Sequence, residues 1–183
     1  NILLKYNLII LNEHDSKTKS LTDKYWTYGR INASDTNLSE LQNQINAWKY
    51  QGVYGIYLDN LSQSRRAQEI SIVQSVQQEG LHLIVSGDIQ RLTSSSSSTY
   101  NPSNEEIPFE ANTKFAIKDF GYAERAGSDN YATKEIIMDS ILPLVRRLKS
   151  KNYEIMGMAR TPNRKSFNFV HTLGLMLGID YLY

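Results

Sequence analysis

The stretch that decides the fold is residues 53–61, VYGIYLDNL, where an apolar run ends at Asp59 and Asn60. The segment before it, residues 38–51, repeats apolar side chains at spacings of three and four, which predicts an amphipathic helix: Leu38, Leu41, Ile45 and Trp48. In a parallel barrel, an active-site acid typically lies at the end of a buried strand that follows a helix. A residue just past the carboxyl end of a barrel strand faces the catalytic mouth.

The rest of the chain repeats this alternation. Apolar runs predict seven strands, at residues 6–11, 26–31, 53–58, 81–85, 114–117, 153–159 and 179–183. Most of these runs are continuous, which is typical of parallel strands covered on both faces. Helical periodicity predicts helices at residues 38–51, 64–79, 131–151 and 163–176. Asn37 with Glu40 indicates a capped start for the first of these helices.

Two segments break the pattern. Residues 13–25 have little apolar periodicity, so the helix there is predicted to be missing or very short. Residues 93–112 contain five consecutive serines and predict a long polar loop. Pro143 is predicted to kink the helix over 131–151 or to begin a new first turn.

The order of strands and helices predicts a parallel α/β fold. We expect a (β/α)8 TIM-type barrel over residues 1–183 as a single domain, either trimmed or missing its first strand, because seven strands are visible where eight are needed. A doubly wound open sheet is the alternative. Its nucleotide-binding version is disfavoured because the chain has neither a GxGxxG nor a Walker pattern.

The composition of the chain excludes several classes of binding partner and site. The formal net charge of +1 gives no strong attraction to nucleic acid, and no apolar run is long enough to span a membrane. The absence of cysteine excludes disulfides and thiolate metal sites. The adjacent residues Glu13, His14 and Asp15 would diverge along a strand, so we predict no metal site and no cofactor. His82 and His171 are predicted to be structural.

Polar residues follow most of the predicted strands, and in a barrel they would converge on one rim. Asp59 and Asp119 are the candidate catalytic pair, since glycoside hydrolysis needs one protonated and one ionised carboxyl group. A loop or helix-capping role is the alternative for either residue. The candidate substrate-binding residues are Tyr28, Asn32, Asn60, Asp88, Tyr122, Glu124 and Arg160. Of these, Tyr28 and Tyr122 would stack on sugar rings, and Glu124 could replace Asp119.

Three segments, YWTYGRINA (25–33), GIYLDNL (55–61) and LIVSGD (83–88), resemble the spherulin-4-like barrels and the related endo-α-1,4-polygalactosaminidases. The resemblance implies a (β/α)8 barrel for amino-sugar polysaccharides, with the fourth-strand acid at Asp59. The family's second acid, usually Glu, would fall near Lys118 or Asp119. Its Asn-Pro-Gly turn is replaced by residues 86–88, Ser-Gly-Asp. Both departures bear on catalysis, because an Asp in place of Glu moves the carboxyl group back by one methylene.

Two functions follow from these features. The first is a glycoside hydrolase-like enzyme acting on amino-sugar polysaccharide. The alternative is a non-catalytic barrel module for glycan binding or assembly in a larger cell-surface or virion structure. Either function predicts a glycan partner and an extracellular or cell-surface location.

Overall fold

The computed structural model describes residues 8–13, 18–34, 37–61, 66–87, 107, 109–122 and 131–183. The chain divides into two compact units, residues 1–110 and residues 111–183. Each unit is described by itself below.

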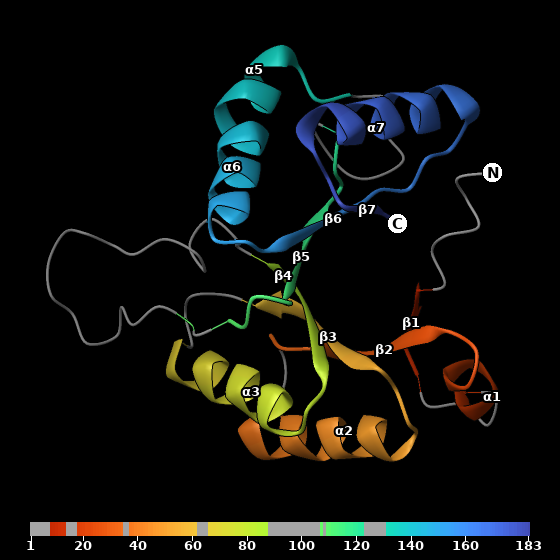
Figure 1. Cartoon of the computed structure of the whole chain (residues 1–183), viewed down its shortest axis with the longest axis vertical. Helices are drawn as coiled ribbons and strands as arrows, with labels where there is room; N and C mark the ends of the chain where they lie inside the picture. The colour runs from red at the N-terminus through yellow and green to blue at the C-terminus, as the bar shows by residue number, and fades with distance from the viewer. Residues whose placement is uncertain are drawn as a thin grey trace, which may run out of the picture. The chain divides into compact units, whose positions relative to one another are not determined.

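The first unit alternates strands and helices in chain order (Figure 1). Its elements are β1 (Leu8–Leu11), α1 (Thr18–Thr22), β2 (Trp26–Asn32), α2 (Leu38–Tyr50), β3 (Gly55–Leu61), α3 (Arg66–Gln78) and β4 (His82–Gly87). The four strands pair in parallel, each with the next one along the chain. Helices α2 and α3 lie side by side along the strands (Figure 1).

The register gives the strands of this unit two distinct faces, because side chains alternate along a strand and paired residues share a face. One face is apolar and includes Gly29 of β2 and Ile56 of β3, which are register partners. The indole ring of Trp48 on α2 packs directly over Gly29, so this face is the one that the helices cover. The opposite face carries Arg30, Tyr57 and Asp59.

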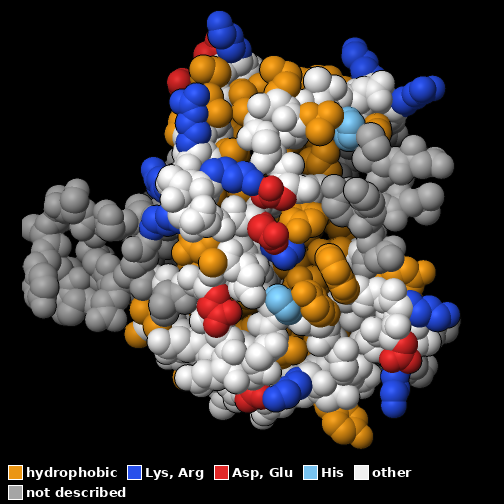
Figure 2. Space-filling view, viewed as in Figure 1, with side chains coloured by type: hydrophobic (Ala, Val, Ile, Leu, Met, Phe, Trp, Pro, Cys, Tyr) orange, Lys and Arg blue, Asp and Glu red, His pale blue; other side chains and the backbone are white. Residues whose placement is uncertain are grey.

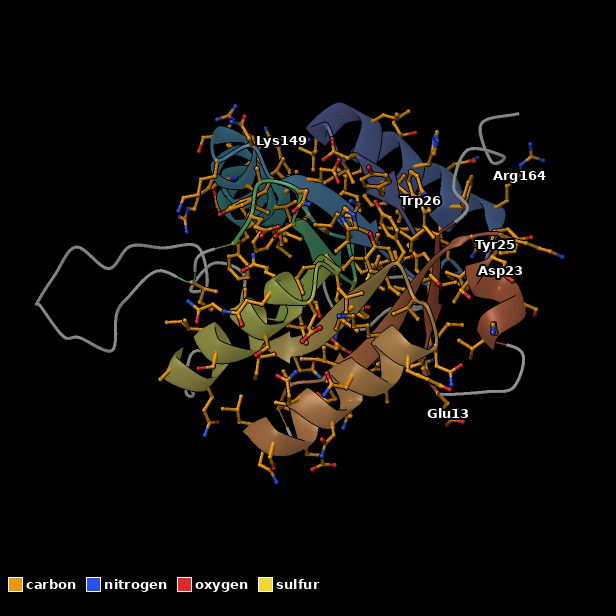
Figure 3. All side chains as sticks on the ribbon, turned by 60° about the horizontal axis from the view of Figure 1, so that its bottom comes forward. Glu13, Asp23, Tyr25, Trp26, Lys149 and Arg164 are labelled. Atoms are coloured by element: carbon orange, nitrogen blue, oxygen red, sulfur yellow. The ribbon has the colours of Figure 1, made fainter. Side chains whose placement is uncertain are left out.

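The second unit has the same alternation over a shorter length. Its elements are β5 (Lys114–Lys118), α5 (Lys134–Ile136), η4 (Ile137–Ile141), α6 (Leu142–Ser150), β6 (Glu154–Met158), α7 (Arg164–Leu177) and β7 (Tyr181–Leu182). Its strands are also parallel, with β6 between β5 and β7. Lys149 of α6, labelled in Figure 3, pairs with Asp180, whose Oδ2 also accepts the Ile155 N–H at 2.7 Å.

Most of the secondary structure agrees with the sequence predictions. The seven strands lie within the seven predicted runs or within three residues of them. The side chain of Asn37 caps α2 by accepting the Glu40 N–H at 2.9 Å, as predicted. The described part of residues 13–25 holds only the five-residue helix α1. The parallel α/β class is therefore confirmed.

The helix predicted over residues 131–151 differs in one respect. It contains a π-helical turn, η4, immediately before α6, and Pro143 lies in the first turn of α6. Proline has no N–H to donate and its ring displaces the carbonyl four residues earlier, so the widened turn accommodates it. Most of the serine-rich loop predicted over residues 93–112 lies outside the described residues, although Ile107 is described and buried.

Candidate functional site

The carboxylate of Asp59, near the carboxyl end of β3, is the centre of a polar network in the first unit. Its Oδ2 accepts from Nη2 of Arg30 at 2.6 Å and from Nε at 3.0 Å. Its Oδ1 accepts from the Ser86 hydroxyl at 2.5 Å and lies 3.1 Å from the Tyr57 hydroxyl. The Asp59 side chain is 2% exposed, whereas the Arg30 side chain is 40% exposed. A buried carboxylate is thus held in place by three partners, one of which reaches solvent.

Strand alternation explains why these groups meet. Tyr57 and Asp59 are two residues apart on β3 and therefore share a face. Arg30 is the register partner of Tyr57, so it lies on the same face of β2. Ser86 is two residues beyond Ile84, the register partner of Tyr57 on β4. Three adjacent parallel strands thus bring the polar group together at their carboxyl ends.

The pairing of β3 with β4 is irregular near the carboxyl ends of these two strands. The register between β3 and β4 shifts between Leu58 and Leu61, and Asn60 has a φ of 59°. Asparagine tolerates this left-handed conformation better than most residues. Gly87 has a φ of 142°, and a Cβ there would lie 2.0 Å from the Leu61 carbonyl oxygen. Only glycine therefore allows β4 to approach the end of β3 this closely.

A second polar cluster lies beside the first. Oδ1 of Asn32 accepts from Nδ2 of Asn60 at 3.0 Å and from the Ser34 hydroxyl at 3.0 Å. Asn12, directly after β1, is reached by Nη1 of Arg30 at 3.4 Å. Arg30, on β2, thus links Asp59 of β3 to Asn12, which follows β1.

Burial raises the pKa of Tyr57 well above its ordinary value of 10.0. The hydrogen bond with Ser86 opposes this shift, and the negative charge of Asp59 adds to it. The hydroxyl therefore remains protonated, as a donor, at any physiological pH.

This raised pKa predicts a loss of stability at alkaline pH. The unfolded chain releases the Tyr57 proton near pH 10 while the folded chain retains it, so folding is weakened as pH rises above about 10, by about 1.4 kcal/mol per pH unit. The Tyr57→Phe variant has no hydroxyl at this position, so this pH-dependent contribution is absent from its free energy of unfolding. Urea denaturation at several pH values between 9 and 11 should show the stability advantage of the wild type over the variant shrinking with pH. A difference that stays constant across this range would contradict the assignment.

The structure assigns the other predicted site residues to three groups. Tyr28 is fully buried and meets Tyr54 edge-on at 5.7 Å, so its ring belongs to the core of the first unit. Asp119, Tyr122 and Arg160 belong to the second unit, where Tyr122 is buried in a cluster with Phe120. The predicted residues Asp88 and Glu124 lie outside the described part of the chain.

Two of the three histidines, His82 and His171, are described, and each stacks on an aromatic ring. The ring of His82, at the start of β4, stacks on Tyr54 at 4.0 Å, and His171 stacks on Phe167 within α7. Within the described ranges, no three His, Asp or Glu side chains are grouped so that they could hold a metal ion. His14 and Asp15 are outside those ranges.

Two further observations concern possible partners. None of the helices among the described residues combines the length and apolarity needed to cross a membrane. Several lysine and arginine side chains gather at the upper left of the face shown in Figure 2, and others stand singly elsewhere on it.

Sequence reasoning did not select three of the residues that hold Asp59: Arg30, Tyr57 and Ser86. Arg30 and Tyr57 lie inside predicted strands, whereas the predicted acid Asp59 and the predicted ligands Asn32 and Asn60 follow the ends of those strands. The available signal was a polar alternation, Arg30 with Asn32 and Tyr57 with Asp59, inside runs that are otherwise apolar.

No family model and no curated protein matches the chain. Solved structures match its fold. It is similar to deoxyribose phosphate aldolase from Aeropyrum pernix, with a TM-score of 0.55, 9% identity and coverage of 90% of this chain and 64% of that one. It is also similar to 2,3-dimethylmalate lyase, of the PEP mutase/isocitrate lyase superfamily, with a TM-score of 0.51, 8% identity and coverage of 90% and 56%.

A third similar structure is the carboxyl transferase domain of Rhizobium etli pyruvate carboxylase with pyruvate and biocytin, with a TM-score of 0.50, 9% identity and coverage of 95% and 32%. The chain therefore spans less than two thirds of the length of each of these proteins. At such identities the likeness concerns the fold alone, which is that of TIM-barrel enzymes.

These findings correct the predicted function. A glycoside hydrolase-like barrel for amino-sugar polysaccharide is wrong, because the similar structures are an aldolase, a lyase and a carboxyl transferase. The alternative function, a non-catalytic module that binds glycan, loses its support for a carbohydrate ligand for the same reason. The chemistry agrees with the correction. A hydrolase acid must reach the glycosidic oxygen, whereas both oxygens of Asp59 are occupied by Arg30, Ser86 and Tyr57.

Proposed function

We propose that the carboxyl ends of β1–β4 bind a small monocarboxylic acid and that Arg30 holds its carboxylate. In this proposal the strands belong to a trimmed (β/α)8 barrel, whose ligands bind at that end. The observation that carries the proposal is that the Arg30 guanidinium is both fixed and accessible. Asp59 holds it with two hydrogen bonds, and 40% of the side chain remains exposed.

Counting donors shows that Arg30 retains binding capacity. A guanidinium has five N–H groups. Two are directed to Asp59 and one to Asn12, which leaves one on each terminal nitrogen. Two N–H groups in one plane match the two oxygens of a carboxylate. Because Arg30 is already immobilised, binding costs little side-chain entropy.

The charge balance favours a monoanion. Asp59 already neutralises Arg30, so a dianion would meet little net positive potential. Among the described residues at the carboxyl ends of β1–β4, Arg30 is the only cation, Asp59 and Glu13 are acidic, and Asn12, Asn32 and Asn60 are neutral. A multiply charged phosphate would need further cations to replace its lost hydration.

One of the structures that share the fold, the carboxyl transferase domain, contains pyruvate, a small monocarboxylic acid.

Pyruvate is the probe for a direct test. Isothermal titration calorimetry with the wild type should give a Kd on the order of 1 mM, because one arginine and a few neutral groups supply only about 4 kcal/mol. Arg30→Lys keeps the positive charge beside Asp59 but loses the planar pair of N–H groups. We expect at least a ~10-fold weaker affinity, equivalent to about 1.4 kcal/mol.

The matched control is Arg146→Lys, the same substitution at an exposed position of α6 in the second unit. It should leave pyruvate affinity unchanged. Inorganic phosphate, titrated in parallel, should bind more weakly than pyruvate. Equal pyruvate affinity in the wild type and in Arg30→Lys would refute the proposal, as would tighter binding of phosphate.

A further inference from the structure

We propose that Asn32 recognises an oxygen on the second carbon of the bound acid, so that the site prefers 2-oxo acids to acids that lack this oxygen. This inference rests on the proposed function, because it takes the carboxylate of the ligand to be held by Arg30. It narrows the ligand class from small monocarboxylic acids to those with an acceptor oxygen next to the carboxylate.

The register of the strands places the Asn32 side chain beside the guanidinium of Arg30. Asn32 follows Arg30 by two residues on β2, so both side chains lie on the same face of the sheet. Asp59, whose Oδ2 accepts from Nε and Nη2 of Arg30, is the register partner of Asn32 on β3. Because paired strands lie about 4.8 Å apart, a ligand whose carboxylate meets Arg30 has its next atoms within reach of Asn32.

The side-chain amide of Asn32 is held in one orientation by its oxygen. Oδ1 accepts from Nδ2 of Asn60 at 3.0 Å, from the Ser34 hydroxyl at 3.0 Å and from the Ser34 N–H at 3.4 Å. The oxygen and the NH2 group of an amide lie on different sides of one planar carbon, so Nδ2 is directed away from Asn60 and Ser34. The NH2 group carries two N–H donors. Asn32, which is only half-buried, therefore acts as a preset donor, and presetting lowers the side-chain entropy lost on binding.

The donor character of this amide selects among ligand groups. A 2-oxo oxygen is an uncharged acceptor, so an amide N–H can donate to it. A methylene in the same place offers no acceptor and would leave the amide without its water and without a partner. A second carboxylate is disfavoured, because Arg30 is the only cation among the described residues at the carboxyl ends of β1–β4.

Pyruvate and propionate test this selection, since they differ only in having a carbonyl or a methylene at the second carbon. Isothermal titration calorimetry of the wild type should give a Kd for propionate at least ~3-fold above that for pyruvate, the effect of one neutral hydrogen bond. In Asn32→Ala this ratio should fall to about 1, because pyruvate binding weakens while propionate binding changes little.

Asn46→Ala is the matched control, since it removes an exposed asparagine amide from α2 of the same unit. It should keep the wild-type ratio of the two affinities. The comparison of pyruvate with propionate in the wild type needs no substitution, so it decides the question even if Asn32→Ala does not fold.

The outcomes separate this inference from the proposed function. Equal affinities of the wild type for pyruvate and propionate would overturn the role of Asn32 and leave Arg30 as the carboxylate ligand. A wild-type ratio retained in Asn32→Ala would overturn it as well. Binding of neither acid would overturn the proposed function, and the role of Asn32 with it.

Discussion

Replacement of Gly29 by alanine is expected to lower the free energy of unfolding by about 3 kcal/mol. A Cβ at this position of β2 would lie 2.2 Å from Cδ2 of Trp48, far inside van der Waals contact. Trp48 is among the largest fully buried side chains, so its indole ring cannot move into solvent. The strand must therefore separate from α2. Chemical denaturation of the wild type and the variant measures the loss.

A double-mutant cycle shows whether the clash with Trp48 is the cause. Trp48→Leu alone should cost about 2–3 kcal/mol because it leaves a cavity. The smaller side chain also makes room for the new methyl group, so the two losses should not add. We expect Gly29→Ala with Trp48→Leu to be at least ~1 kcal/mol more stable than the sum of the single losses predicts. Additive losses would mean that the methyl group meets something else.

Replacement of Arg30 by leucine is expected to lower the free energy of unfolding by about 2–3 kcal/mol. Removing one partner of a buried ion pair typically costs about 3–5 kcal/mol, because the remaining charge is buried without compensation. The lower value is appropriate here because Arg30 is 40% exposed while Asp59 is almost completely buried. Urea denaturation near pH 7 measures the effect.

Two controls separate the ion pair from a general loss of charge. Arg146→Leu removes an exposed cation from α6 and should change stability by no more than about 0.5 kcal/mol. Arg30→Lys keeps a cation near Asp59 and should cost about 1 kcal/mol, less than Arg30→Leu. If Arg30→Leu is no worse than Arg146→Leu, the pair with Asp59 contributes nothing to the fold.

Much of the fold could be predicted because local patterns and tertiary structure agree in this chain. The apolar run predicted over residues 53–58 overlaps β3 (Gly55–Leu61), which is buried on both faces, as parallel strands are. The stripe of Leu41, Ile45 and Trp48 is the buried side of α2. The start of that helix follows from a single local contact, the Asn37 cap. Each of these features depends on residues close together in sequence.

The candidate site could be predicted only in outline. The position of Asp59 near the carboxyl end of a strand followed from the sequence, but its partners did not. Arg30 and Ser86 are 29 and 27 residues away from Asp59 along the chain. Only the register between neighbouring strands brings them together, and a single sequence does not determine register.

The hydrolase prediction was wrong for the same reason, because the sequence did not reveal the partners of Asp59. A carboxylate at a strand end is chemically ambiguous until its neighbours are known. A catalytic acid needs a position that can exchange a proton with substrate. Asp59 accepts from an arginine and a serine, with the Tyr57 hydroxyl 3.1 Å away, and this environment suits a permanent negative charge that positions Arg30. Its resemblance to a glycosidase acid lay in sequence position alone.

The central claim, that Arg30 binds a carboxylate, is tested most directly by nitrogen-15 NMR of the arginine side chains during a pyruvate titration. The Nε–H resonance of Arg30 is assigned by its absence from Arg30→Lys. We predict that this resonance shifts progressively and saturates with pyruvate, while the Nε–H resonance of Arg146 stays in place. An Arg30 resonance that does not move at saturating pyruvate would contradict the account.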